Sequence, residues 1–136
     1  MKVYFSSKSR WHPWVSALEA AGVPISSSWH RWPWNKDDDS EPPHEAKAAH
    51  SLQCLSEASS CDVCLLFAQR GEVHLGAIAE AAAALSHDKT LFLVAPHHDW
   101  WFLRCHRNCR SLDSLDAAVQ AVLAMAEGER LRGLAA

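Results

Sequence analysis

Glu80 is the residue of this chain whose type and position most clearly allow chemistry. It is the one acidic residue in the segment HLGAIAEAAAALSH at 74–87, which predicts an alanine-rich helix. In an α/β domain, the start of such a helix borders the crevice at the strand ends where ligands bind. Glu80 is therefore a candidate reactive acid. The alternative is a solvent-exposed helix acid, which is the commonest role of a helical glutamate.

A polar loop follows the first strand-like segment. It combines hydroxyl groups, backbone N–H groups and positive charge just before a predicted helix, in Ser6, Ser7, Lys8 and Arg10. Such groups suit an anion, for example a 5′-phosphate. The alternative is an ordinary solvated loop.

The chain has 7 tryptophans, and most of them lie in or beside the first two strand-to-helix connections. Connections of this kind line the ligand crevice of an α/β domain. Aromatic faces there can stack on a nucleobase, and Trp29 is our first candidate. The alternative is that these rings bury a loop against the body of the protein. The residues concerned are Trp11, Trp14, Trp29, Trp32 and Trp34.

The spacing of Cys61 with Cys64, and of Cys105 with Cys109, is compatible with zinc ligands. The first pair, however, begins a predicted buried strand. Residues three apart on a strand point to opposite faces, so both thiols would rarely meet one metal ion. We therefore expect free thiols, no bound metal and no organic cofactor.

Periodicity and punctuation of the sequence predict an alternation of strands and helices. Pro13 suits the start of the first helix and Gly22 its end. Residues 27–43 have the composition of a long, mobile flap. Strands are predicted at 2–6, 23–26, 62–67 and 90–95, with a weaker one near 102–106. Further helices are predicted at 44–59, with Ala48, Leu52 and Leu55 as apolar positions, at 74–87, and from about 111 to Gly128.

This alternation predicts a parallel sheet covered on both faces. The expected fold is an α/β three-layer sandwich with a five-stranded, mainly parallel sheet of flavodoxin-like or Rossmann-like type. We expect a single domain at 1–128 and a loose C-terminal tail at 129–136.

The predicted helix 74–87 also bears on assembly. An outer helix of a monomer normally has a polar outer face, but the face away from the expected sheet contact is almost without charge. We therefore expect a homo-oligomer, a dimer or larger, with the flap or the last helix as the alternative cover. The expected sheet-facing residues are Leu75, Ile78, Ala79, Ala82 and Leu85, and the other face has Gly76, Glu80, Ala83 and Ala84.

Bulk properties exclude several classes of protein. The net charge is −3 and the basic residues are scattered, which argues against nucleic acid as a partner. No apolar run is long enough to cross a membrane, and the N-terminus does not resemble a signal peptide. The 5 cysteines are an odd number and follow no disulfide framework. These features predict a cytoplasmic protein with reduced thiols.

Three stretches together resemble the nucleoside 2-deoxyribosyltransferase-like superfamily, including its uncharacterised, often phage-encoded members. The first is KVYFSS at 2–7, similar to the opening strand of the family with its tyrosine. The second is ASSCDVCLLF at 58–67, similar to the acid and apolar strand before the catalytic turn. The third and most specific is GAIAEAAAALSHDKTLFLV at 76–94.

The resemblance implies cleavage or transfer of the N-glycosidic bond of a 2′-deoxynucleoside or its 5′-monophosphate. It implies that Glu80 is the nucleophile, which forms a covalent deoxyribosyl intermediate, and that Tyr4 orients it. Tyr4 could instead serve only in core packing. Glu72 or His74 is the expected acid that protonates the departing base. The expected substrate-binding residues are Ser6, Ser7, Lys8, Trp29, Asp62, Gly71 and Gly76.

The chain departs from the family pattern in two places. Ala81 replaces the glycine that usually follows the nucleophile, and His87-Asp88 replaces a small residue and glycine before Lys89. These departures leave open a second function, a non-catalytic nucleotide-binding or sensing module of the same fold.

Overall fold

A computed structural model describes residues 1–8, 11, 13–33, 41–72, 74–96 and 100–135. The strands are β1 (Val3–Ser6), β2 (Val63–Phe67), β3 (Thr90–Val94) and β4 (Cys109–Ser111). The helices are α1 (Trp14–Ala20), the 3-10 turn η2 (Trp29–Arg31), α2 (His44–Ser60), α3 (Leu75–Ser86), α4 (Trp101–Arg104) and α5 (Leu115–Ala135). None of the helices in the described ranges is long and apolar enough to cross a membrane.

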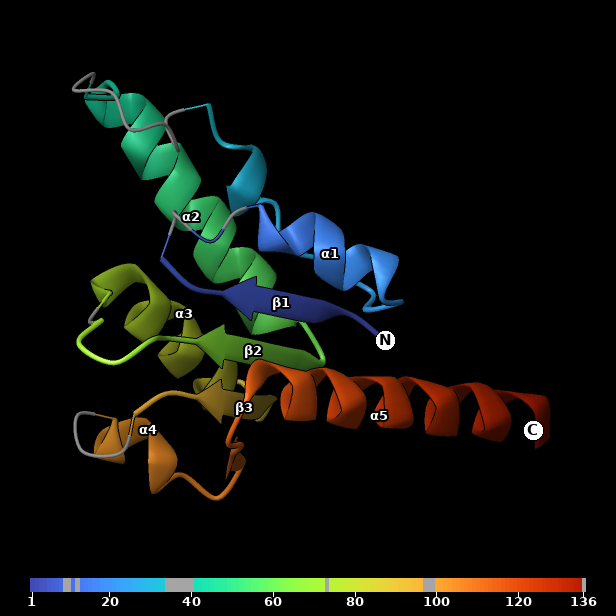
Figure 1. Cartoon of the computed structure of the whole chain (residues 1–136). Coiled ribbons are helices and arrows are strands. Elements are labelled where there is room, and N and C mark those ends of the chain that lie inside the picture. The colour runs from blue at the N-terminus through green and yellow to red at the C-terminus, as the bar shows by residue number, and fades with distance from the viewer. Residues whose placement is uncertain (9–10, 12, 34–40, 73, 97–99, 136) are drawn as a thin grey trace.

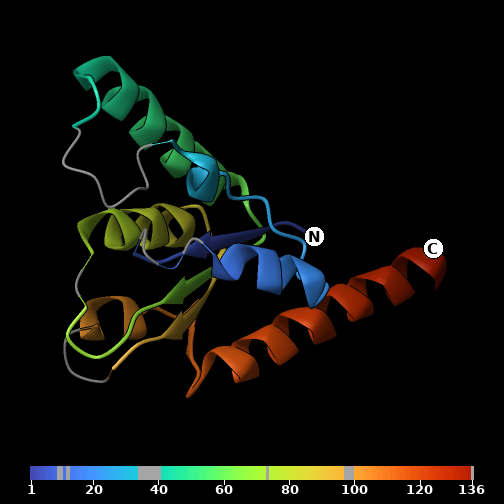
Figure 2. The same cartoon turned by 45° about the horizontal axis from the view of Figure 1, so that its top comes forward.

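The four strands form one parallel sheet in the order β1-β2-β3-β4. Helices α2 and α3 lie on one face of this sheet, and α1 and α5 lie on the other (Figures 1 and 2). The predicted α/β class, with a parallel sheet between helical layers, is confirmed. The arrangement is that of a Rossmann-like sandwich.

The sheet has four strands in the described residues and not the five that were predicted. In the predicted strand 23–26, only Ile25 forms a bridge, with Val3. Pro24 accepts a hydrogen bond from the backbone N–H of Val3 but has no N–H of its own to give. Further along the outer edge of β1, a side chain replaces backbone pairing, since the Ser27 hydroxyl accepts a hydrogen bond from the N–H of Phe5 at 3.2 Å.

Two predictions at the C-terminal end are also wrong. The stretch 102–106 is not a strand, since α4 ends at Arg104 and β4 begins only at Cys109. The last helix does not end at Gly128 and no loose tail follows there, because α5 continues to Ala135. A single glycine costs a helix only about 1 kcal/mol relative to alanine, and the surrounding residues are strong helix formers. The end of α5 projects beyond the sheet (Figure 1).

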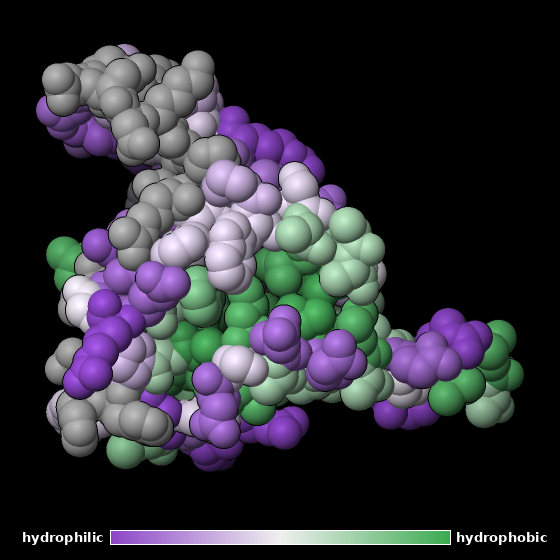
Figure 3. Space-filling view, in the orientation of Figure 1, coloured by the Kyte–Doolittle hydropathy of each residue, from purple (hydrophilic) through white to green (hydrophobic). Residues whose placement is uncertain are grey.

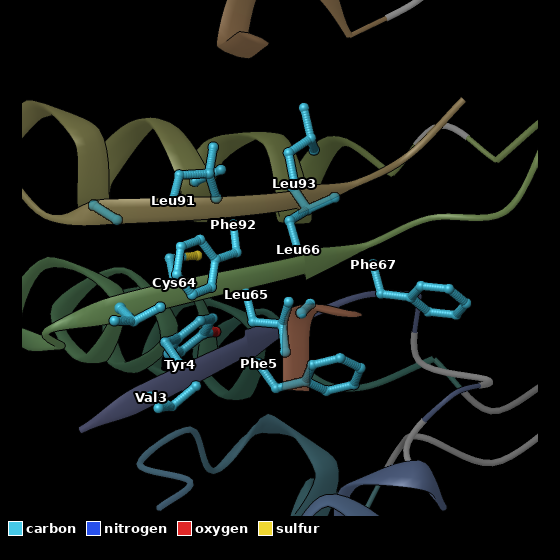
Figure 4. Close-up of a cluster of buried hydrophobic side chains, with 14 of the residues drawn as sticks. Val3, Tyr4, Phe5, Cys64, Leu65, Leu66, Phe67, Leu91, Phe92 and Leu93 are labelled. Atoms are coloured by element: carbon cyan, nitrogen blue, oxygen red, sulfur yellow. The ribbon is translucent and has the colours of Figure 1, made fainter. Parts of the chain in front are cut away.

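The core is built on the strands. All four residues of β1 and all five of β2 are buried, as strands covered on both faces must be. Tyr4 pairs in register with Cys64, which pairs with Leu91. Figure 4 shows these side chains packed with their neighbours from β1, β2 and β3. The inward-facing residues of the helices on each side complete this core.

Helix α3 turns a different face to the sheet from the one predicted. Its buried residues are Ala77, Glu80, Ala81, Ala84 and Leu85, whereas Leu75 is 78% exposed. The prediction followed the largest apolar side chains, and only Leu85 of the expected stripe is among the buried residues. The alanine face is the buried one because small side chains let α3 approach both the sheet and α2 closely. As a result, Glu80 points into the protein.

Candidate active site

A cavity of about 350 Å³ lies beyond the carboxyl end of β1, between η2, α2 and α3. This is the position at which parallel α/β sheets bind ligands. The cavity contains the candidate reactive acid, Glu80. Its lining residues are Ser7, Trp29, Trp32, His50, Ser51, Cys54, Leu55, His74, Gly76, Ala79 and Glu80.

Glu80 is a buried carboxylic acid, 9% exposed. Side chains alternate along a strand, so Tyr4 and Ser6 of β1 share the face that lies under α3. The Ser6 hydroxyl donates a hydrogen bond of 2.5 Å to Oε2 of Glu80. Burial raises the pKa of Glu80 to about 7, and the Ser6 hydrogen bond opposes this rise. Near neutral pH, the acid is therefore divided between its charged and neutral forms.

Tyr4 of β1 is fully buried and lies near Glu80. Burial, and next the negative charge of Glu80, raise the pKa of the Tyr4 phenol, so it stays neutral. Its hydroxyl makes no hydrogen bond of normal geometry with the described residues. Tyr4 is thus a neutral phenol close enough to Glu80 for the two groups to affect each other's pKa.

His74 is the N-cap of α3 and borders the cavity. Its Nδ1 accepts the backbone N–H of Ala77 at 3.0 Å, so the proton of the neutral ring is on Nε2. Burial, and next the nearby positive charge of Lys8, lower the pKa of His74. Gly76 makes room for this ring, since a Cβ at position 76 would lie 2.9 Å from Cε1 of His74.

The structure adds two residues that sequence reasoning did not select, His50 and Cys54 on α2. The predicted apolar positions of this helix gave no hint of them, and one of these, Leu52, is 72% exposed. The His50 ring stacks on Trp32 with centroids 3.9 Å apart and planes 3° apart. Nε2 of His50 lies 3.6 Å from Sγ of Cys54. The available signal was their spacing of four residues, which places both on one helix face.

The η2 segment is anchored so that its tryptophans reach the cavity. Glu57 of α2 accepts the backbone N–H of Ser28 at 2.9 Å and its hydroxyl at 2.6 Å. Trp29 is buried and donates a 2.5 Å hydrogen bond from Nε1 to the carbonyl of Phe5. Trp29 therefore closes the edge of β1 while also lining the cavity.

Six predicted site residues do not line the cavity. Tyr4, Ser6 and Lys8 interact with residues that do line it, through Glu80 and His74. Glu72, Asp62 and Gly71 lie elsewhere. Glu72 is buried elsewhere, where its carboxylate accepts hydrogen bonds from Nε1 of Trp11 at 3.0 Å and from the N–H of Gln69 at 2.7 Å. Asp62 immediately precedes β2, at the opposite end of the sheet. Gly71 is a turn residue with φ of 80°. Among the other predictions, Arg10 and Trp34 lie outside the described residues.

In the described part of the chain, no group of three or more His, Cys, Asp or Glu residues is arranged to hold a metal ion. The cysteines are all free, and burial raises the pKa of Cys54 to about 11. Cys54 is therefore a neutral thiol at pH 7.

A second, larger cavity of about 560 Å³ lies on the other face of the sheet, between α1 and the start of α5. Apolar side chains gather on this face (Figure 3). Its acids, Asp113 and Asp116, are exposed. The smaller cavity holds a buried carboxylic acid, so we place the candidate active site there, with Glu80.

No protein-family model matches this chain, and no curated protein matches it. Its structure is similar to that of the CMP N-glycosidase BcmB from Clostridium botulinum, with a TM-score of 0.55 and 15% sequence identity. The similarity covers 90% of this chain and 98% of the neighbour. At this identity, the likeness shows a shared fold.

Proposed function

We propose that this protein breaks the N-glycosidic bond of a 2′-deoxynucleoside or its 5′-monophosphate, with Glu80 as the nucleophile. The observation that carries the proposal is a buried carboxylate, hydrogen-bonded by Ser6, that faces a cavity at the ligand-binding edge of the sheet. The fold shared with a CMP N-glycosidase supports the same class of reaction and adds CMP to the substrates worth testing.

The chemistry follows from the carboxylate. An oxygen of ionised Glu80 attacks C1′ of the sugar, while the electrons of the C1′–N bond leave with the base. The product is a glycosyl ester of Glu80. Water then attacks C1′ in a hydrolase, or a second base attacks it in a transferase, and Glu80 is released with overall retention of configuration. Tyr4 is the proposed orienting group, since its neutral hydroxyl lies beside Glu80.

The end of the cavity at the start of α3 suits the anionic part of the substrate. The N-terminus of a helix favours negative charge, and Gly76 leaves room there for the His74 ring. The Nε2–H of His74 and the hydroxyl of Ser7 line the same end, and the charge of Lys8 is close enough to affect His74. We assign these groups to a 5′-phosphate. Of the two expected acids, only His74 borders the cavity.

The test is release of free base, separated by chromatography, from a panel of deoxynucleosides, their 5′-monophosphates and CMP. Glu80→Gln keeps the size of the side chain and a hydrogen-bond acceptor for Ser6 but removes the nucleophile. We expect release by the wild type and a loss of at least about 1,000-fold in the variant. A second base added to the assay separates transfer from hydrolysis. Ligand binding without any release, and unchanged in the variant, would instead favour the binding module.

A further inference from the structure

The candidate cavity has two chemically different ends. The start of α3 contributes polar groups, with His74 and Ser7. The part between η2 and α2 is mainly aromatic and apolar, and its residues are Trp29, Trp32, His50, Ser51, Cys54 and Leu55. A nucleotide is polar at its phosphate and flat and aromatic at its base. The cavity therefore orients a nucleotide with the base toward α2.

His50 is held rigidly at this base end. Its ring lies parallel to Trp32, and its Nε2 contacts the Cys54 thiol. The segment that carries Trp32 is tied to α2 by the two hydrogen bonds between Ser28 and Glu57. A ring fixed in this way presents its nitrogen atoms at a defined position.

We propose that His50 protonates the leaving base, an inference that rests on the proposed function. As the C1′–N bond breaks, its electron pair passes to the base, and the His50 imidazolium gives a proton to a nitrogen or oxygen of that base. In the second step, neutral His50 takes a proton from the attacking water, and the imidazolium is restored. The same residue thus serves both steps as acid and then as base.

The other groups at this end are poorer acids. The Cys54 thiol holds its proton too tightly, because burial raises its pKa to about 11. Serine, tryptophan and leucine side chains do not release a proton near neutral pH. Burial lowers the pKa of His50, and Glu57 on the same helix opposes this effect. His74 is at the phosphate end and uses Nδ1 to cap α3.

The experiment compares two leaving groups on the same sugar phosphate, the natural base and p-nitrophenolate. The nitrophenolate leaves without a proton, whereas the base needs one. We expect His50→Gln to slow release of the base by about 100- to 10,000-fold, the usual contribution of a general acid. In the first turnover, before water has to attack the ester, release of nitrophenolate should change by less than about 10-fold, because this leaving group needs no proton and the nucleophile Glu80 is intact.

The matched control is His44→Gln, an exposed histidine at the start of the same helix, which should leave both rates unchanged. Thermal unfolding of His50→Gln checks that the variant folds. Equal losses with both leaving groups, or no loss with either, would overturn the role of His50 while leaving Glu80 as the nucleophile. If the wild type releases neither group, the proposed function and the role of His50 both fail.

Discussion

At the scale of single residues, the proposed chemistry depends on Glu80 being buried. A buried carboxylate is costly to ionise, which is why its pKa rises to about 7 from an ordinary value of 4.5. A charged nucleophile that lacks its water shell is also more reactive, because less solvation must be removed. The buried position of Glu80 therefore lowers the stability of the fold and raises the reactivity of the carboxylate. The free energy of unfolding and the rate of base release measure these two effects.

The stability cost has a defined pH range. The folded pKa lies above the unfolded value, so folded Glu80 binds its proton more tightly than the unfolded chain does. The stability from this proton is fully present below pH 4.5 and is lost as the pH rises to about 7. We expect Glu80→Gln to raise the free energy of unfolding at pH 8 by up to about 3 kcal/mol relative to its effect at pH 4. Urea unfolding at both pH values tests this, and equal effects at the two would contradict it.

The Ser6 hydroxyl lowers the pKa of Glu80 and so opposes the effect of burial. This hydroxyl stabilises the charged carboxylate, so Ser6→Ala should raise the pKa of Glu80 further. The pH at which base release reaches half of its maximum should rise by about 1 unit, the effect of one hydrogen bond to a charged group. The exposed Ser16→Ala on α1 is the control. A lower rate with an unchanged pH profile would show that Ser6 does not act through the ionisation of Glu80.

At the scale of elements, the site depends on close packing between helices and strands, which sequence patterns do not reveal. The strands and long helices follow from apolar runs, from Pro13 and from Gly22, and most of their bounds agree with the structure to within a few residues. The buried face of α3 did not follow, because it consists of alanines rather than large apolar residues. His50 was missed for a related reason. It is part of the site because its ring stacks on Trp32, and the sequence does not show that these two distant residues meet.

Substitution of Gly76, at the start of α3, tests the proposed phosphate-binding end of the cavity. A methyl group there meets the His74 ring at 2.9 Å, so Gly76→Ala should displace the ring and raise KM for 5′-monophosphates by about 10-fold or more. The deoxynucleosides without phosphate should be affected less. Gly133→Ala is the matched control, because nothing lies within 4 Å of that position in α5. The control should stabilise the protein by about 0.5–1 kcal/mol with unchanged kinetics. An unchanged KM in Gly76→Ala would count against the phosphate assignment.

At the scale of the whole molecule, the fold leaves one uncharged face of α3 exposed to solvent. The sequence predicted a face of α3 for self-association that the structure partly buries. The face that is exposed instead, with Leu75, Ala79, Ala82 and Ser86, also lacks charge, since Glu80 is the only charged residue of this helix. The outer face of α3 is therefore uncharged, as expected, but it consists of other residues than those predicted.

We expect this surface to join two copies of the chain. Light scattering after size exclusion should give twice the chain mass of 15.1 kDa, and Ala82→Glu should reduce it to the single-chain mass. A buried, unpaired charge at an interface is strongly destabilising, and this is the reason for the expected dissociation. Ala48→Glu, at an exposed position on α2, should leave the mass unchanged. A mass of 15.1 kDa for the wild type at micromolar concentration would remove the homo-oligomer.

The most direct test of the central claim is to trap the glycosyl ester of Glu80. A deoxynucleotide analogue with fluorine at C2′ destabilises the oxocarbenium-like transition states and slows breakdown of the ester. After incubation with wild-type protein, intact-mass spectrometry should show the added sugar phosphate, and peptide mapping should place it on Glu80, with no addition to Glu80→Gln. An enzyme that releases base but gives no adduct, or gives one on another residue, would contradict Glu80 as the nucleophile.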